Sequence, residues 1–130
     1  MARVFTLGEA NRLVPRLENL FDRLNRLRAS AQPIQASMTH VEQYGYSNGV
    51  DQATKLRELR GQLDAKLNEL KVVFEEITAL GCEVKDAEVG LVDFPAERDG
   101  RVVYLCWRRG EDQIRYWHEL DAGFAGRQPL

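Results

Sequence analysis

The sequence has few cysteines, few histidines and no long apolar run. It contains two cysteines and two histidines in 130 residues, too few cysteines for a disulfide framework. The longest uninterrupted apolar stretch, Val102 to Trp107, is far too short to cross a bilayer. The first ten residues also lack the apolar segment of a signal peptide. We therefore expect a cytoplasmic protein with both thiols reduced.

An excess of charge of either sign is also missing. Lysine and arginine number 18 against 20 aspartates and glutamates, a formal net charge of −2, so no overall attraction to nucleic acid or anionic lipid follows. The locally basic residues 1–30 are interpreted as a solvated helix face with i,i+4 pairs. There is no P-loop, no glycine-rich dinucleotide motif and no CxxC pair. We expect neither a membrane nor a nucleic-acid partner, and the sequence identifies no small-molecule or protein partner.

Leucine at helical spacing dominates the first eighty residues. Residues 6–9 fit a capping box, in which the threonine hydroxyl takes a first-turn N–H and the glutamate reaches back. Leucines recur at steps of three and four from Leu13 to Leu27, and a second stripe runs from Leu56 to Leu80. A glycine-containing loop over residues 44–49 separates the two. We predict a long antiparallel helical hairpin over about residues 6–80.

A hairpin of this length leaves apolar surface to be covered. At ~1.5 Å per residue a thirty-residue helix is roughly 45 Å long. Self-association into a four-helix bundle would bury the two seams, whereas in the alternative the sheet packs along the hairpin within one chain. The coiled-coil spacing of the leucines favours a homodimer through the long helices.

The hydrophobic period changes from helical to two after Gly90. Asp99-Gly100 is typical of a type I′ hairpin turn, and Gly110-Glu111 suits a type II′ turn. The predicted strands cover residues 90–94, 101–108 and 113–118. The predicted fold class is α+β: one domain, residues 1–130, with the helical hairpin packed on a three-stranded antiparallel β-meander and a C-terminal tail over about residues 90–130.

The two predicted turns determine which side chains share a face of the sheet. The first turn places Asp93 opposite Cys106, and the second places Cys106 opposite Arg115. One face is then apolar: Val92, Phe94, Val103, Leu105, Trp107, Ile114 and Tyr116, with His118 opposite Val103. The other face, together with the tail, supplies the candidate ligand-binding residues: Asp93, Glu97, Tyr104, Cys106, Arg115, Trp117 and Arg127.

The row of Asp93, Cys106 and Arg115 has two interpretations. In one, Arg115 holds an anion while Cys106 or Asp93 carries out chemistry, since a neighbouring cation lowers a thiol pKa and an adjacent carboxylate opposes this. In the other, a cross-strand ion pair lies over an inert thiol. No residue is assigned a catalytic role, because no histidine is predicted beside Cys106.

The end of the last predicted strand brings metal-competent side chains together in sequence. Imidazole and carboxylates are ligands for borderline divalent metals, which makes His118, Glu119 and Asp121 metal candidates. The alternative is a strand-end histidine bonded to backbone or carboxylate. In the tail that follows, Arg127 could complete a pocket over the polar face, or Phe124 could simply dock the segment.

Three segments carry a resemblance to a known family. They are TLGEANRLVP near the start, GLVDFPAERDGRVVYLCWR after residue 89, and IRYWHELDAGFAGRQPL at the end. Together they resemble the prokaryotic family DUF2203, a domain of unknown function, over essentially the whole chain. The resemblance implies a bacterial or archaeal cytoplasmic protein and transfers no site residue. The favoured function is a non-catalytic dimeric interaction or small-ligand-binding module; the alternative is a metal-binding or hydrolytic enzyme using the polar face, with a divalent metal as candidate cofactor.

Overall fold

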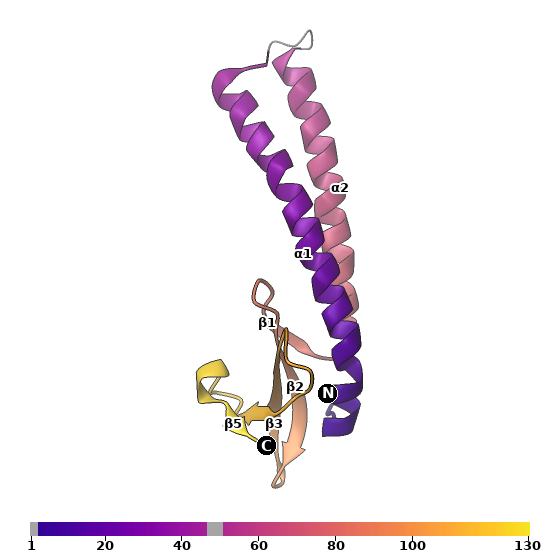
Figure 1. Cartoon of the computed structure of the whole chain (residues 1–130), viewed down its shortest axis with the longest axis vertical. Helices are drawn as coiled ribbons and strands as arrows, with labels where there is room; N and C mark the ends of the chain where they lie inside the picture. The colour runs from indigo at the N-terminus through magenta and orange to yellow at the C-terminus, as the bar shows by residue number, and fades with distance from the viewer. Residues whose placement is uncertain (1–2, 47–50) are drawn as a thin grey trace. The chain divides into compact units, whose positions relative to one another are not determined.

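The computed structural model describes residues 3–46 and 51–130. Its elements are shown in Figure 1: α1 (Leu7–Tyr44), α2 (Gln52–Ala79), β1 (Glu83–Asp86), β2 (Leu91–Arg98), β3 (Arg101–Arg108), β4 (Tyr116–His118), a 3-10 turn η1 (Phe124–Gly126) and β5 (Gln128–Pro129). These residues form two compact units, Arg23–Phe74 and the combination of Met1–Asp22 with Glu75–Leu130. Ser47 to Gly49 of the predicted loop lie outside the described residues.

Both helices begin with the side-chain caps that their sequences call for. The Thr6 N–H donates to Glu9 Oε1 (2.8 Å) and the Glu9 N–H to Thr6 Oγ1 (3.1 Å), so the predicted capping box is confirmed. Before α2, Asp51 Oδ1 accepts the Thr54 N–H at 2.7 Å. Gly81 follows α2 with φ +97°, and a side chain there would meet the Phe5 ring.

The unit Arg23–Phe74 is a helical hairpin with a small core of its own. The cluster contains Ala31, Met38, Val41, Leu59 and Leu63, with Ile34, Tyr46 and Leu56 packed against it. On α2, by contrast, Leu67, Val72 and Phe74 expose much of their apolar surface. Among the described residues, neither helix has a stretch apolar enough and long enough to cross a membrane.

The other unit carries a five-stranded antiparallel sheet in the order β1-β2-β3-β4-β5. The α+β class is confirmed, but the predicted three strands are too few. The two missed strands lie at the edges and are short, and the four residues of β1 include three charged ones. β2 also continues past Phe94 through Pro95, where β1 no longer pairs with it and no ladder hydrogen bond needs the missing N–H.

The register predicted for the first hairpin is confirmed in full. Arg98 pairs with Arg101 and Asp93 with Cys106. Asp99 and Gly100 both have positive φ, at 52° and 78°, as a type I′ turn requires.

The register predicted for the second hairpin is wrong by one residue. β3 ends at Arg108 and β4 starts only at Tyr116, and Cys106 pairs with Tyr116 instead of Arg115. The intervening chain is a loop whose N–H groups bond to α1: Ile114 donates to Asn11 Oδ1 (2.7 Å) and Gly110 to Glu18 Oε1 (2.9 Å). The tight turn itself lies at Arg109–Gly110, one residue earlier than predicted, where the Glu111 N–H donates to the Arg108 carbonyl (3.0 Å), and the helix side chains hold the chain on either side of Glu111.

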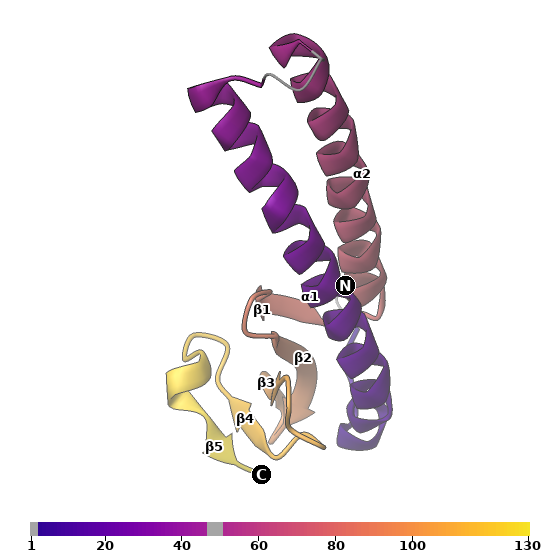
Figure 2. The same ribbon diagram turned by 45° about the horizontal axis from the view of Figure 1, so that its top comes forward.

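The sheet has an apolar side against α1 and a polar side beneath the C-terminal segment. Phe5 meets Phe94 edge-on at 5.1 Å between ring centroids, and Phe21 of α1 contacts Trp107 at 6.0 Å. Figures 1 and 2 show the yellow C-terminal segment on the side of the sheet away from the first turns of α1. Asp93, Cys106 and His118 on the polar side are buried.

Candidate functional site

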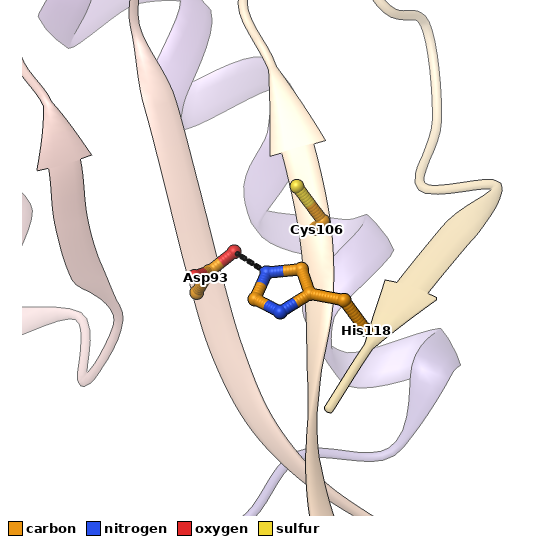
Figure 3. A group of neighbouring side chains, drawn as sticks. All are labelled: Asp93, Cys106 and His118. Atoms are coloured by element: carbon orange, nitrogen blue, oxygen red, sulfur yellow. Dashed lines mark hydrogen bonds and ion pairs between the residues drawn. The ribbon is translucent and has the colours of Figure 1, made fainter. Parts of the chain in front are cut away.

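Three chemically active side chains meet at the centre of the polar side (Figure 3). Asp93 comes from β2, Cys106 from β3 and His118 from β4, and they are exposed by only 1%, 0% and 2%. Their carboxylate, thiol and imidazole donor atoms all lie within 4.8 Å of one another. Direct pairing brings Asp93 opposite Cys106, and the pairing of His118 with Tyr104 puts the imidazole on the same face.

The contacts of His118 define where its protons lie. Its Nδ1–H donates to the carbonyl oxygen of Glu119 at 2.8 Å, because a carbonyl can only accept. Its Nε2 lies 2.9 Å from Asp93 Oδ1. A carboxylate and a bare imidazole nitrogen would repel each other, so this contact holds one shared proton, carried by either Asp93 or His118.

Cys106 is a protonated, unactivated thiol. Burial first, and then the charge of Asp93, raise the pKa of Cys106 to about 12, while the nearby Arg127 guanidinium acts in the opposite sense. His118 directs Nε2 to Asp93. A cysteine nucleophile activated by histidine is therefore not what this geometry provides.

Tyr104 lies between His118 of the cluster and the Glu83 carboxylate of β1. Its ring lies 5.5 Å from the ring of His118, and its hydroxyl donates to the Glu83 carboxylate at 2.9 Å. Burial and this hydrogen bond raise the pKa of Tyr104, which keeps the hydroxyl protonated. Lys85 Nζ bonds to Glu83 at 3.0 Å and lies 4.8 Å from the centre of the Tyr104 ring.

Arg127 fastens the tail over the polar side. Its guanidinium donates to both oxygens of Glu111 (2.8 and 2.9 Å) and to the carbonyl of Cys106 (3.3 Å). The same group lies 4.1 Å from the centre of the Tyr116 ring and 4.6 Å from that of Phe124. Arg127 therefore links the tail directly to the strand that carries Cys106.

A pocket of about 300 Å³ opens between the sheet and the tail. Asp93, Tyr104 and His118 line it from the sheet, Lys85 lines it from β1, and residues 120–124 form its outer wall. Two of the three clustered side chains thus border the pocket, although almost none of their surface is exposed. The prediction that the tail could complete a pocket agrees with this arrangement, although Arg127 itself is not in the pocket wall.

The structure separates the other predicted site residues from the cluster. Arg115 lies outside it and pairs with the exposed Asp112; Glu97 is exposed near the end of β2. Trp117 is buried on the apolar side opposite Leu105, with the Arg98 guanidinium 4.7 Å from its ring. The positions of Arg115 and Trp117 follow from the one-residue shift of β4, which exchanges its faces. Glu97 lies on the predicted face, but near the far end of β2 from Asp93.

Of the predicted metal candidates, only His118 belongs to the cluster. Glu119 forms an ion pair with Arg101 at the end of the sheet, and Asp121 lines the pocket. The prediction of His118 on the apolar face is wrong. The bulk of Trp117 was the available signal: burying that side chain in the core places its neighbour His118 on the polar face.

No curated protein and no solved structure matches the chain. A match to a family described as "Uncharacterized conserved protein (DUF2203)" extends over residues 3–130, essentially its full length. The earlier resemblance is therefore confirmed, and the chain belongs to the DUF2203 family.

Proposed function

We propose that the protein binds a divalent transition metal of the zinc class through Asp93, Cys106 and His118. The observation that carries this is the hydrogen bond from His118 Nδ1 to the Glu119 carbonyl. A ligating histidine typically donates its second ring N–H in this way, which directs the lone pair of the other nitrogen to the metal. Here that nitrogen faces Asp93 and belongs to donor atoms within 4.8 Å of one another.

The charge of the three side chains supports a dication. A carboxylate, a thiolate and a neutral imidazole sum to −2, which a divalent ion cancels. Burial of Asp93 and Cys106 as anions would otherwise be costly in this solvent-free setting. The metal would replace the proton shared by Asp93 and His118 and the proton of the Cys106 thiol, since metal ligands must be deprotonated.

The donor types select the metal class. Calcium and magnesium prefer sites made of oxygen ligands, whereas nitrogen, sulfur and oxygen together suit zinc and its neighbours. Three protein ligands leave one position of a tetrahedral zinc site open, as in catalytic sites. The pocket that reaches Asp93 and His118 offers space for a fourth ligand. A metal held there would supply an acidified water or a polarised carbonyl, the chemistry of hydrolysis.

Titration of metal-free protein with Co²⁺ tests the proposal. We expect one equivalent to bind, with thiolate-to-cobalt absorption in the near ultraviolet. The variant Cys82→Ser should keep this absorption, because Cys106 is then the only thiol in the chain. Cys106→Ser should lose it. Asp93→Asn and His118→Gln should weaken binding by more than the roughly 10–100-fold that changes outside the ligand set cost.

The design does not depend on every variant folding. The wild-type spectrum and its retention in Cys82→Ser assign the thiolate without any change at the cluster. Far-ultraviolet circular dichroism identifies variants that are folded before their affinities are compared. Absence of thiolate absorption in the wild type, or its loss in Cys82→Ser alone, would leave Asp93 and His118 as a metal-free proton-sharing pair and contradict the proposal.

A further inference from the structure

A second hollow adjoins the pocket at the cluster. It measures about 340 Å³ and is lined by Asp86, Val89, Leu91, Arg108 and Phe124. Leu91 of β2 and Phe124 of η1 also line the first pocket. The two hollows therefore border on the same two side chains, and a ligand that extends past Leu91 and Phe124 would occupy both.

The two hollows differ in chemical character. The first contains Asp93, His118 and the Lys85 ammonium. The second is lined mainly by apolar side chains, of which Val89 and Phe124 each remain 41% exposed. Exposed apolar side chains gathered beside a polar pocket are typical of a ligand-binding groove.

We propose that the joined pocket binds a small amphipathic carboxylate, with its carboxylate at the Asp93–Cys106–His118 metal and its apolar arm against Val89, Leu91 and Phe124. The inference rests on the proposed metal site, because the open position of the dication attracts an anion. Lys85, which is ion-paired with Glu83, also lines that end. Arg108, whose guanidinium lies 5.9 Å from the centre of the Phe124 ring, frames the apolar end.

Three probes separate the two ends of the ligand. Octanoate carries both the anion and the arm, acetate carries only the anion, and 1-octanol carries only the arm. Calorimetry on zinc-loaded protein should give octanoate an affinity at least about tenfold above either of the others, since burial of an apolar arm is worth ~0.8 kcal/mol per methylene. Removal of the zinc should weaken octanoate and acetate binding and leave 1-octanol unchanged.

Substitutions test the placement of the arm. Val89→Ser should weaken octanoate binding by about tenfold, the loss expected when an apolar contact is removed, while the affinity for acetate and for Co²⁺ stays unchanged, because Val89 lines the second hollow and not the pocket at the cluster. Val102→Ser is the matched control, because Val102 is exposed to a similar degree, 43%, and is absent from the walls of both hollows. Its octanoate affinity should equal that of the wild type.

The outcomes separate this inference from the metal proposal. If Co²⁺ binds but octanoate binds no tighter than 1-octanol or acetate, the ligand class is wrong and the metal site stands. Octanoate binding that is equal with and without zinc would also overturn the placement of the carboxylate. If Co²⁺ does not bind, the metal proposal fails first, and the inference that rests on it fails with it.

Discussion

At the scale of the residue, the ring of His118 decides what the cluster can do. One nitrogen donates to the Glu119 carbonyl and the other shares a proton with Asp93. Because of this hydrogen bond, we expect asparagine and alanine at position 93 to have different effects on stability. An asparagine can donate an N–H to His118 Nε2, whereas an alanine leaves the nitrogen buried without a partner.

We therefore expect Asp93→Ala to destabilise metal-free protein more than Asp93→Asn does. A buried polar group that loses its partner costs about 1–3 kcal/mol, and His118 is almost fully buried. Urea unfolding at neutral pH measures the difference between the variants. Equal losses of stability would mean that His118 Nε2 does not need a donor opposite it.

Cys82 gives stability a dependence on alkaline pH. Burial raises the pKa of this thiol to about 11 from an ordinary value of 9.0. Above pH 9 the unfolded chain releases this proton while the folded protein retains it, so the free energy of unfolding falls as pH rises to about 11. A pKa difference of one between the folded and unfolded states corresponds to ~1.4 kcal/mol, so the free energy of unfolding falls by roughly 2–3 kcal/mol in all.

Comparison with Cys82→Ser isolates this contribution from the other groups that titrate in the same range. Denaturant unfolding at pH 8, 9, 10 and 11 should show the difference between wild type and variant moving in favour of the variant as pH rises. A difference that stays constant over that range would show that Cys82 ionises equally in both states.

At the scale of the element, the tail from Glu119 to Leu130 depends on Arg127. Arg127 and Glu111 are mostly buried around their ion pair, whereas Arg115 and Asp112 form theirs in solvent. Hydrogen bonds to charged groups contribute about 1.5–3 kcal/mol when shielded, and exposed ion pairs about 0–1 kcal/mol. The two arginines therefore make a matched comparison on neighbouring segments.

We expect Arg127→Met to lower stability by about 1.5–3 kcal/mol and Arg115→Met to change it little. Amide hydrogen exchange should also accelerate at Leu130, whose N–H donates to the Arg115 carbonyl (2.9 Å), in Arg127→Met only. Equal exchange in both variants would mean that β5 and the tail are held without the Arg127–Glu111 pair.

The elements also show how far sequence reasoning extends. The helices and the first hairpin were predictable because capping residues, leucine spacing and Asp99-Gly100 are local signals. The second connection was not, because its course depends on Asn11 and Glu18, about a hundred residues away in sequence. Two of the three clustered residues, Asp93 and Cys106, were therefore predicted to lie together, and His118 was placed on the wrong face.

At the scale of the whole molecule, the homodimer predicted from the leucine seams stays a prediction. The exposed apolar side chains of α2 in the unit Arg23–Phe74, including Leu67 and Phe74, are the surface such a dimer would bury. A dimer formed there should dissociate when a charge replaces Leu67, because burial of an unpaired carboxylate is costly.

Light scattering at micromolar concentration should then give twice the chain mass of 14.9 kDa for the wild type and a lower mass for Leu67→Glu. Gln62→Glu adds the same charge at another exposed position of α2 and should leave the mass unchanged. A wild-type mass of one chain would show that the prediction of a homodimer is wrong.

Asn11 and Glu18 of α1 accept hydrogen bonds from the loop before β4. A helix on the apolar side of the sheet therefore helps to determine which β4 side chains face the polar side. A strand that shifts by one residue turns every side chain to the opposite face. Substitutions of Asn11 and Glu18 could therefore turn His118 away from the polar side and bring Trp117 there, although no proposed ligand residue is itself substituted. If the sheet were transferred to another protein to rebuild the cluster, the first turns of α1 would consequently have to be transferred with it.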